Sequence, residues 1–448
     1  MEPVIEHAAE LARTETHRAI LDAITDAIEA VHPGTIIPQQ VSLSNGQLLV
    51  ADAAYPLPGD GRVFVIGAGK PAGHAAFALE RILGDVIDGG VVITDQSVDC
   101  ERIEVIEGTH PLPSERNVSA TTRLVDVAET ATEDDLIIAI LGGGGSALLC
   151  SPADGIPLEV YRRVIDDLLE AGASITELNA VRKHLSTVKG GQLARRLAST
   201  PTVALVFSDV VGDPLDVIAS GPLAPDPTTF QRAIDVFNTY RLTPPAAAST
   251  HLERGRNGEY RETPGPEASC FDQVTHHLLA TNHRALSVAK ETLEAHGYPA
   301  QILSSRIEGE SRDVGSAFAG IALGVYHEGD LADPPIALIS GGETTVTVEG
   351  DGYGGPNQEF VLAAALSIGG TPTIVAAIDT DGIDGNSPFA GAIADGMSVS
   401  DRHTAREALD RNDATGYLES VSAGIKTGPT GTNVNDLRIL LVEHHKED

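Results

Sequence analysis

The chain contains no long hydrophobic run, and nothing in its 448 residues approaches the roughly 20 consecutive apolar residues that cross a bilayer. The N-terminal segment Met1–Thr16 is acidic and lacks the apolar stretch of a secretory signal, so we expect a cytoplasmic protein. Cysteine is equally sparse. Cys100, Cys150 and Cys270 show no paired spacing, which argues against a disulfide framework and against a zinc site.

Positive charge is also scarce, with 30 lysine and arginine residues against 64 aspartate and glutamate residues and a net charge of −34. Such a surface repels nucleic acid and anionic membranes, so we expect neither as a partner. Only six residues are lysine, which favours a halophilic protein over an ordinary acidic one, because carboxylates keep a surface hydrated at high salt. Three of those lysines, Lys70, Lys183 and Lys189, lie in motif-like segments and are candidates for chemistry.

Short apolar segments alternate with helical segments through the first half of the chain. Strands are predicted at Val63–Gly67, Gly90–Thr94, Ile103–Ile106, Leu136–Leu141 and Val203–Ser208, and helices at Pro71–Leu83, Ser119–Thr130 and Leu158–Ala171. Apolar strands separated by helices are typical of a parallel sheet that is covered on both faces. The pattern predicts an α/β protein in which residues 1–245 form a doubly wound, Rossmann-like domain.

The segment 241–270 interrupts this alternation, because it is polar and rich in proline and glycine. Residues 246–270 are therefore predicted to form a linker or exposed loop, followed by a smaller mixed α/β domain over residues 271–448. There, helices are predicted at Asp272–His296, Asp313–Tyr326 and Asn357–Ile368, and strands at Ala300–Leu303, Ile336–Ser340, Thr344–Val348, Thr373–Ile378 and Leu437–Val442.

Three glycine-rich segments follow apolar strands: GAGKPA from Gly67, LGGGGSALL from Leu141 and ISGGETT from Ile339. Glycine lets the backbone approach a ligand closely, and a helix that begins behind it offers N–H groups to anions. Three such segments predict a ligand with several phosphates. Lys70 in the first segment suits phosphate, although GAGKPA also fits the dinucleotide fingerprint, with Asp95 as the ribose-binding acid.

Charged side chains gather beside these segments. Asp209 comes directly after a strand, Glu343 lies in ISGGETT and Asp381 lies in DTDGIDG. Carboxylates beside phosphate-binding loops suggest magnesium. Arg182 and Lys189 belong to the segment LNAVRKHLSTVKGGQLA, a basic cluster that is unusual in so acidic a chain and suits an anionic substrate.

Eight motifs together resemble, in order along the chain, the glycerate 2-kinases of the two-domain type, whose C-terminal half is often labelled the MOFRL domain. They are GAGK, THPLP, LGGGGSALL, LNAVRKHLSTVKGGQLA, SDVVGDPLDVIASGPLAPDPTTF, ISGGETTVTV, GGPNQEF and DTDGIDG. The resemblance implies an active site in the cleft between a Rossmann-like domain and a smaller domain. It also implies that ATP, with a divalent metal, phosphorylates the 2-hydroxyl of D-glycerate. Members have often been labelled hydroxypyruvate reductases, so an NAD(P)H-dependent reductase is the alternative.

With this resemblance the candidate residues take roles. Lys70, which corresponds to the family's lysine in the first loop, and Asp209 would be catalytic, and Asp209 with Glu343 or Asp381 would hold Mg²⁺. Phosphate binding is expected from Gly67, Gly69, Gly143, Gly144, Gly145, Ser146, Gly341, Gly342 and Asn357.

The substrate side has three candidates and one departure from the family. His110 in THPLP, Arg182 and Lys189 would receive the carboxylate of glycerate. The arginine of the family's GGRNQE motif is Pro356 here, which removes one positive charge but suits the first turn of a helix. The sequence leaves open whether the chain forms a homo-oligomer.

Overall fold

The computed structural model describes residues 4–197, 199–329 and 331–444. The chain divides into two compact units. We call residues 33–279 the central unit, and residues 1–32 together with residues 280–448 the terminal unit, because it contains both ends of the chain. No helix in the described residues is long and apolar enough to cross a membrane.

The central unit is built on a six-stranded sheet with the order β6-β5-β4-β7-β8-β9. Its strands are β4 (Val63–Ala68), β5 (Gly89–Thr94), β6 (Glu104–Glu107), β7 (Leu136–Gly142), β8 (Thr202–Phe207) and β9 (Val274–Ala280). The four ladders from β6 to β8 are parallel. The strand order reverses between β4 and β7, and open α/β sheets bind their ligands at such a switch point, beyond the carboxyl ends of the strands.

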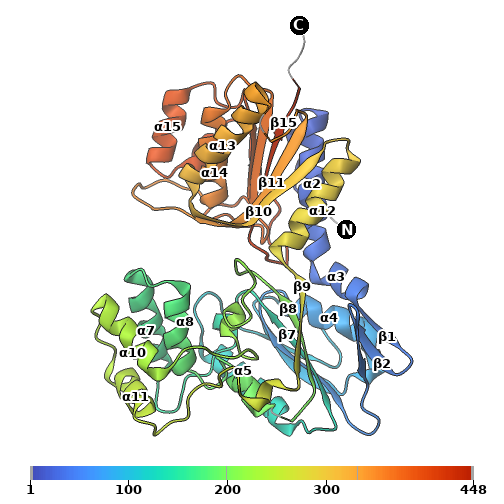
Figure 1. Ribbon diagram of the computed structural model, residues 1–448, viewed down its shortest axis with the longest axis vertical. Helices are drawn as coiled ribbons and strands as arrows, with labels where there is room; N and C mark the ends of the chain where they lie inside the picture. The colour runs from blue at the N-terminus through green and yellow to red at the C-terminus, as the bar shows by residue number, and fades with distance from the viewer. Residues whose placement is uncertain (1–3, 198, 330, 445–448) are drawn as a thin grey trace. The chain divides into compact units, whose positions relative to one another are not determined.

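Helices α4 (Ala72–Leu83) and α5 (Glu115–Thr130) pack on this sheet. Three further groups belong to the unit. The first is α3 (Pro33–Gln40) with the antiparallel strands β1 (Val41–Ser44), β2 (Gln47–Val50) and β3 (Ala53–Pro56). The second, labelled in Figure 1, consists of the helices α7 (Leu158–Glu170), α8 (Ile175–His184), α10 (Phe230–Tyr240) and α11 (Ala246–Arg256). The third consists of the short helices α6 (Gly145–Leu148) and α9 (Gln192–Arg196). Its core includes one hydrophobic cluster against the sheet and another among α7, α8, α10 and α11.

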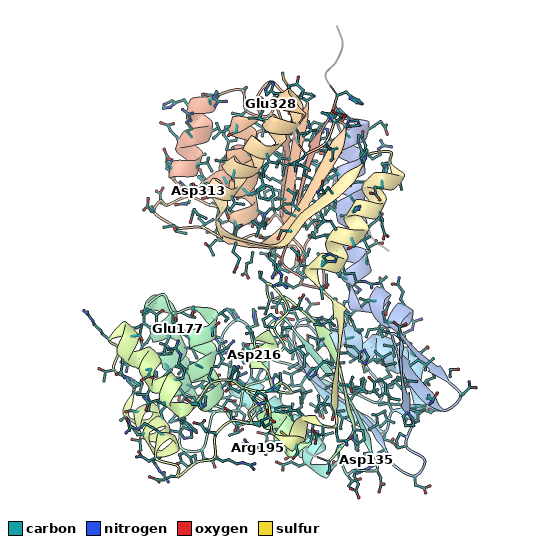
Figure 2. The ribbon with its side chains drawn as sticks, viewed as in Figure 1. Asp135, Glu177, Arg195, Asp216, Asp313 and Glu328 are labelled. Carbon is teal, nitrogen blue, oxygen red and sulfur yellow. The ribbon has the colours of Figure 1, made fainter. Side chains whose placement is uncertain are left out.

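A buried carboxylate connects the starts of β4 and β7. Asp135, labelled in Figure 2, is 3% exposed and accepts hydrogen bonds from the backbone N–H and the guanidinium of Arg62 and from Thr132. Hydrogen bonding to Arg62 holds the pKa of this carboxyl well below its ordinary value. The two strands that flank the switch point are therefore held in register at their amino ends.

The terminal unit contains a second six-stranded sheet with the order β10-β11-β15-β12-β13-β14. Only the β10–β11 pair is parallel among its five ladders. Figure 1 shows α2 (Glu15–Val31) and α12 (Asn282–Ala295) on one face, and α13 (Ser311–Glu328) and α14 (Pro356–Ser367) on the other. The remaining elements are α1 (Ala8–Leu11), β10 (Ala300–Glu310), β11 (Ile336–Thr345), β12 (Thr373–Asp379), β13 (Gly391–Asp395), α15 (Arg402–Asp410), α16 (Ala414–Ser420), β14 (Gly424–Ile425) and β15 (Asp436–Val442).

The structure corrects several sequence-based expectations. The segment predicted as a linker contains α11, and the helix predicted at Asp272–His296 is strand β9 followed by α12. The strands predicted at Ile336–Ser340 and Thr344–Val348 are one strand, β11. The units divide after residues 32 and 279, whereas the sequence placed its boundaries at residues 245 and 271. Short apolar runs do not distinguish strand from helix by periodicity alone, which explains the error at β9.

Candidate active site

The loops that follow β4 and β7 are joined at the switch point of the central sheet. The backbone N–H of Lys70 donates to the carbonyl of Gly143 at 2.7 Å, and that of Gly69 donates to the carbonyl of Ile93 at 3.1 Å. The segment predicted to cradle phosphate through its glycines therefore uses two of its N–H groups internally. Its role is to hold the Lys70 side chain beside the second loop.

The second loop, Gly143–Ser146, places three successive glycines directly after β7. Gly144 adopts a left-handed conformation with φ of 76° and begins the single turn of α6. Successive N–H groups in a left-handed turn before a helix form a concavity that attracts anions. We call residues 143–146 the anion nest.

Three predicted side chains converge on the anion nest. A Cβ atom built on Gly144 would lie 3.1 Å from Cδ2 of His110 and 3.1 Å from Cγ of Lys70. A Cβ atom built on Gly143 would lie 2.4 Å from Oδ2 of Asp209. Lys70 and Asp209 are half-buried and His110 is exposed. Two potential cations, a carboxylate and a row of N–H groups therefore share one site.

A chain of hydrogen bonds connects the nest to the basic segment. The hydroxyl of Ser146 lies 2.8 Å from that of Ser220, which donates to Oδ1 of Asn179 at 3.0 Å. Arg182 donates to the same amide oxygen at 3.2 Å. Arg182 therefore lies one helical turn along α8 from a residue that is hydrogen-bonded into the nest.

Lys189 does not take the position that its predicted role requires. Its side chain is fully buried, and Nζ donates to the carbonyls of Ser146 at 2.8 Å and Leu149 at 2.7 Å. Burial lowers the pKa of this ammonium to about 7. The direct contact with a substrate carboxylate predicted from the sequence is therefore replaced by a contact with the backbone behind the nest.

The neighbouring Lys183 has a structural role. It is 1% exposed, and Nζ lies 3.3 Å from Oδ2 of Asp216 and 3.3 Å from Oδ1 of Asp226. Asp216 is labelled in Figure 2. This lysine connects α8 to the chain after β8, and its charge is neutralised by carboxylates.

Gly67 and Gly69 serve packing. Gly67 lies within β4, and a Cβ atom there would approach the carbonyl oxygen of Ile140 on β7 to 2.5 Å. Gly69 has φ of 146°, and a Cβ atom would meet the backbone of Gly142 at 2.9 Å. Both glycines let β4 and its loop lie against β7. The expectation that they contact phosphate stays a prediction.

In the terminal unit, Gly341 and Gly342 lie inside β11 and not in a loop after it. They pair with Leu437 and Asp436 on β15. A Cβ atom on Gly341 would lie 1.9 Å from Oδ1 of Asn282, and one on Gly342 would lie 2.2 Å from the carbonyl oxygen of Ile307. The phosphate-binding loop predicted here is a stretch of strand where close packing requires glycine.

The motif GGPNQEF forms the first turn of α14, with Pro356 in that turn as the sequence predicts. The carboxylate of Asp384 accepts the backbone N–H groups of Asn357 and Gln358, at 3.0 and 2.9 Å. The buried Asn357 also donates from Nδ2 to Oδ1 of Asp436 at 2.6 Å. The N–H groups expected to face phosphate are thus satisfied by a carboxylate of the same unit.

Acidic side chains gather where β12 and β15 meet. Asp379 is paired with Asp436, and Asp379 accepts the backbone N–H of Asp381 at 2.9 Å. Burial, together with repulsion from Asp381 and Asp436, raises the pKa of Asp379 well above its ordinary value. Arg438, which is fully buried, donates to Asp436 and to Thr344. This cluster is an internal polar network of the terminal unit.

The described residues do not contain a preformed metal site made of protein side chains alone. In the described residues, no group of three or more histidine, cysteine, aspartate or glutamate side chains is placed to hold a metal ion. Glu343 is exposed on β11, in register with Glu308 on β10. Asp209 lies at the nest, where a bound phosphate would supply further oxygen ligands. One or two carboxylates plus substrate phosphates are the usual arrangement for magnesium.

Sequence reasoning missed the amides that position the site. Asn117 is fully buried and binds the backbone of Thr109 and the carbonyl of Ala147, so it holds the loop of His110 beside α6. Asn179 performs the corresponding role toward Ser220. The pattern Ser114-x-x-Asn117 before a helix could have marked the first of these as a capping residue.

The chain matches two family models: DUF4147, described as a domain of unknown function, over residues 19–253, and the MOFRL family over residues 336–436. It is 37% identical to glycerate 2-kinase of Pyrococcus horikoshii over 94% of this chain and 96% of that protein. It is 35% identical to D-glycerate 2-kinase of Thermotoga maritima over 94% of this chain and 97% of that protein. A protein of Agrobacterium vitis named putative hydroxypyruvate reductase is 40% identical over 85% of this chain and 100% of its own length.

Solved structures agree with these relatives. The crystal structure of a Pyrococcus horikoshii protein superposes with a TM-score of 0.84 at 36% identity, covering 96% of this chain and 99% of that one. The crystal structure of glycerate kinase from Thermotoga maritima superposes with a TM-score of 0.83 at 35% identity, covering 95% of this chain and 98% of that one. The chain, which carries the DUF4147 and MOFRL segments, therefore belongs to the glycerate 2-kinase family.

Proposed function

We propose that this protein transfers the γ-phosphoryl group of ATP to the 2-hydroxyl of D-glycerate and releases 2-phosphoglycerate. The observation that carries the proposal is the convergence of Lys70, His110 and Asp209 on the anion nest, at the switch point of the central sheet. Phosphoryl transfer requires positioning and charge neutralisation more than covalent chemistry. A row of N–H groups beside a lysine and a carboxylate supplies those requirements.

Each residue then has a defined task. The N–H groups of Gly143, Gly144 and Gly145 hold phosphate oxygens, and the Lys70 ammonium neutralises charge that develops on the transferred group. Two roles are open to Asp209: it accepts the proton of the attacking hydroxyl, or it holds the metal. Arg182 and His110 receive the glycerate carboxylate. Lys189 does not contact substrate in this mechanism.

Magnesium is part of the proposal because an oxygen-rich site forms when phosphates lie beside Asp209. When bound, the metal supplies charge neutralisation between the phosphate oxygens. The metal roles of Glu343 and Asp381 stay predictions. Pro356 brings no charge, so we propose that Arg182 supplies the positive charge toward the substrate that the family's arginine would provide.

The alternative is an NAD(P)H-dependent hydroxypyruvate reductase, the function named for the Agrobacterium vitis relative. A dinucleotide loop needs free N–H groups in GAGKPA to hold a pyrophosphate. The N–H groups of Gly69 and Lys70 donate within the protein, which argues against that function. No observation in the described residues favours it.

One paired assay distinguishes the two functions. Protein in molar KCl is incubated with D-glycerate and ATP–Mg²⁺, and in parallel with hydroxypyruvate and NADH or NADPH. We expect ADP formation that depends on glycerate and no oxidation of the nicotinamide. Oxidation without ADP formation would overturn the proposal. ADP formation with another hydroxy acid, and not with glycerate, would show that Pro356 marks a change of substrate.

Salt adaptation, cellular location and the classes of partner that are disfavoured also belong to the proposal. The net charge of −34 supports a halophilic protein, and we propose that it works in a cytoplasm of high salt concentration. The same charge disfavours nucleic acid and anionic membranes as partners.

A further inference from the structure

Lys189 is unusual among buried lysines because, within the described residues, its ammonium is paired with carbonyls and not with a carboxylate. Its two acceptors are the carbonyl oxygens of Ser146 and Leu149. The charged and titratable groups that act on it are Cys150 and Arg182, and Arg182 is a second cation. By contrast, Lys183 on the same segment is paired with two aspartates. Burying an ammonium without an opposite charge is costly, so a stabilising or functional gain must offset that cost.

The acceptors of Lys189 lie in and at the end of a short helix that begins within the nest: Ser146 belongs to α6, and Leu149 is its C-cap. Helix α6 spans four residues, Gly145–Leu148. A helix of one turn is not stable by itself, because the first turn fixes several dihedral angles for one hydrogen bond. A cation at the carbonyl end of a helix complements its dipole. Lys189 therefore supplies from outside the stability that this turn lacks.

The segment that carries Lys189 is itself held in place. The N–H of Gly190 donates to the carbonyl of Ser220 at 3.0 Å, and that of Gly191 donates to the carbonyl of Gly221 at 2.7 Å. The hydroxyl of Ser220 lies 2.8 Å from that of Ser146 in the nest. The ammonium and this hydroxyl pair thus both hold α6.

From this arrangement we propose that Lys189 is a positioning residue: it holds the carbonyls of Ser146 and Leu149 and thereby directs the N–H groups of Gly143, Gly144 and Gly145 toward the phosphates of the nucleotide. The inference rests on the proposed function for the identity of the anion. The proposal that Lys189 orders the nest does not depend on which anion binds there, and it is tested separately.

The first test measures order in the nest without any substrate. Hydrogen exchange is followed by mass spectrometry in a peptide that covers residues 142–150, and in a reference peptide from α7. Lys189→Met should speed exchange in residues 142–150 by about tenfold, since two hydrogen bonds from a charged donor are lost. Exchange in α7 should not change. The control Lys290→Met removes a surface lysine that is paired with Glu294 on α12, and it should change neither peptide.

The second test separates positioning from a general structural role. Lys189→Met should raise the KM for ATP by about tenfold and change the KM for glycerate by less than about twofold, because the nest binds phosphate and not the carboxylate. Lys189→Arg retains the charge and donors and should restore most of both properties. Faster exchange without a change in any KM would confirm that Lys189 orders the nest. It would contradict the proposal that this order serves binding of the nucleotide.

The proposal can be overturned in two ways. A folded Lys189→Met or Lys189→Gln variant with unchanged exchange in residues 142–150 and an unchanged KM for ATP would overturn it. Failure of the Met, Gln and Arg variants to fold would also overturn it, in favour of a lysine needed only for the core. Absence of kinase activity in the wild type, with exchange responding as expected, would refute the proposed function and leave the ordering role intact.

Discussion

Replacing Gly144 by alanine tests whether the anion nest and Lys70 form one site. Gly144 has φ of 76°, so an alanine there is held in a left-handed conformation that costs about 1–2 kcal/mol. Gly172 has the same φ of 76° and nothing within 4 Å of the position of its Cβ atom. Gly172→Ala therefore carries the same backbone cost without any new contact, and it is the matched control.

The two variants differ in what the new methyl group meets. In Gly144→Ala it would lie 3.1 Å from Lys70 and 3.1 Å from His110, closer than ordinary van der Waals contact. Both side chains must move by a few tenths of an ångström. Since a displacement of about 1 Å in an active site costs roughly 100-fold in rate, we expect kcat to fall by about 10- to 100-fold.

Thermal unfolding and steady-state kinetics in molar KCl measure both parts. Each variant should unfold about 2–8 °C below the wild type, as about 1–2 kcal/mol implies for a unit of this size. Only Gly144→Ala should lose activity. A Gly144→Ala variant with the kcat of the wild type, or an equal loss in Gly172→Ala, would refute the idea that Lys70 and the nest act at one site.

Three other results are expected. Lys70→Ala should lower kcat by about 100-fold or more with little change in thermal unfolding, since one preorganised charge contact contributes about 3–4 kcal/mol to catalysis; near-normal turnover would reduce Lys70 to a turn residue. Unfolding temperature and activity should rise from low salt toward molar KCl, where the Debye length shrinks to about 3 Å; a flat profile would contradict the halophilic assignment. Asp135→Asn should lower the free energy of unfolding by about 1–3 kcal/mol at pH 7. Because Arg62 depresses the folded-state pKa of Asp135 below that of the unfolded chain, this contribution is present above about pH 4 and is lost as the pH falls below it, which urea titrations of both proteins would detect.

The central unit was predictable because its strands are buried on both faces. An apolar run between two helices indicates a strand that is buried on both faces, and Leu136–Leu141, which forms most of β7, is such a run. The terminal unit was harder, since its mostly antiparallel strands include short and glycine-rich ones. The sequence predicts a loop at Gly341 and Gly342, because glycine at a strand end and glycine required by close packing look alike in a sequence.

The candidate site was predictable only in part. Lys70, His110 and Asp209 follow strands of one parallel sheet, whose carboxyl ends meet at one edge, and the structure brings them together at the nest. The direction of a side chain is a tertiary property that the sequence did not reveal. Lys189 and Asn357 lie in the expected motifs, yet both side chains make internal contacts. The amides Asn117 and Asn179 carry no signal of their function in the sequence beyond a capping pattern.

The position of the transferred phosphate tests the central claim most directly. The product of the reaction with D-glycerate and ATP–Mg²⁺ in molar KCl is coupled to enolase without phosphoglycerate mutase, and the same product is examined by phosphorus NMR. We expect immediate formation of phosphoenolpyruvate and the resonance of 2-phosphoglycerate. A product that reaches enolase only after mutase is added would be 3-phosphoglycerate, and it would contradict the assignment of this chain as a glycerate 2-kinase.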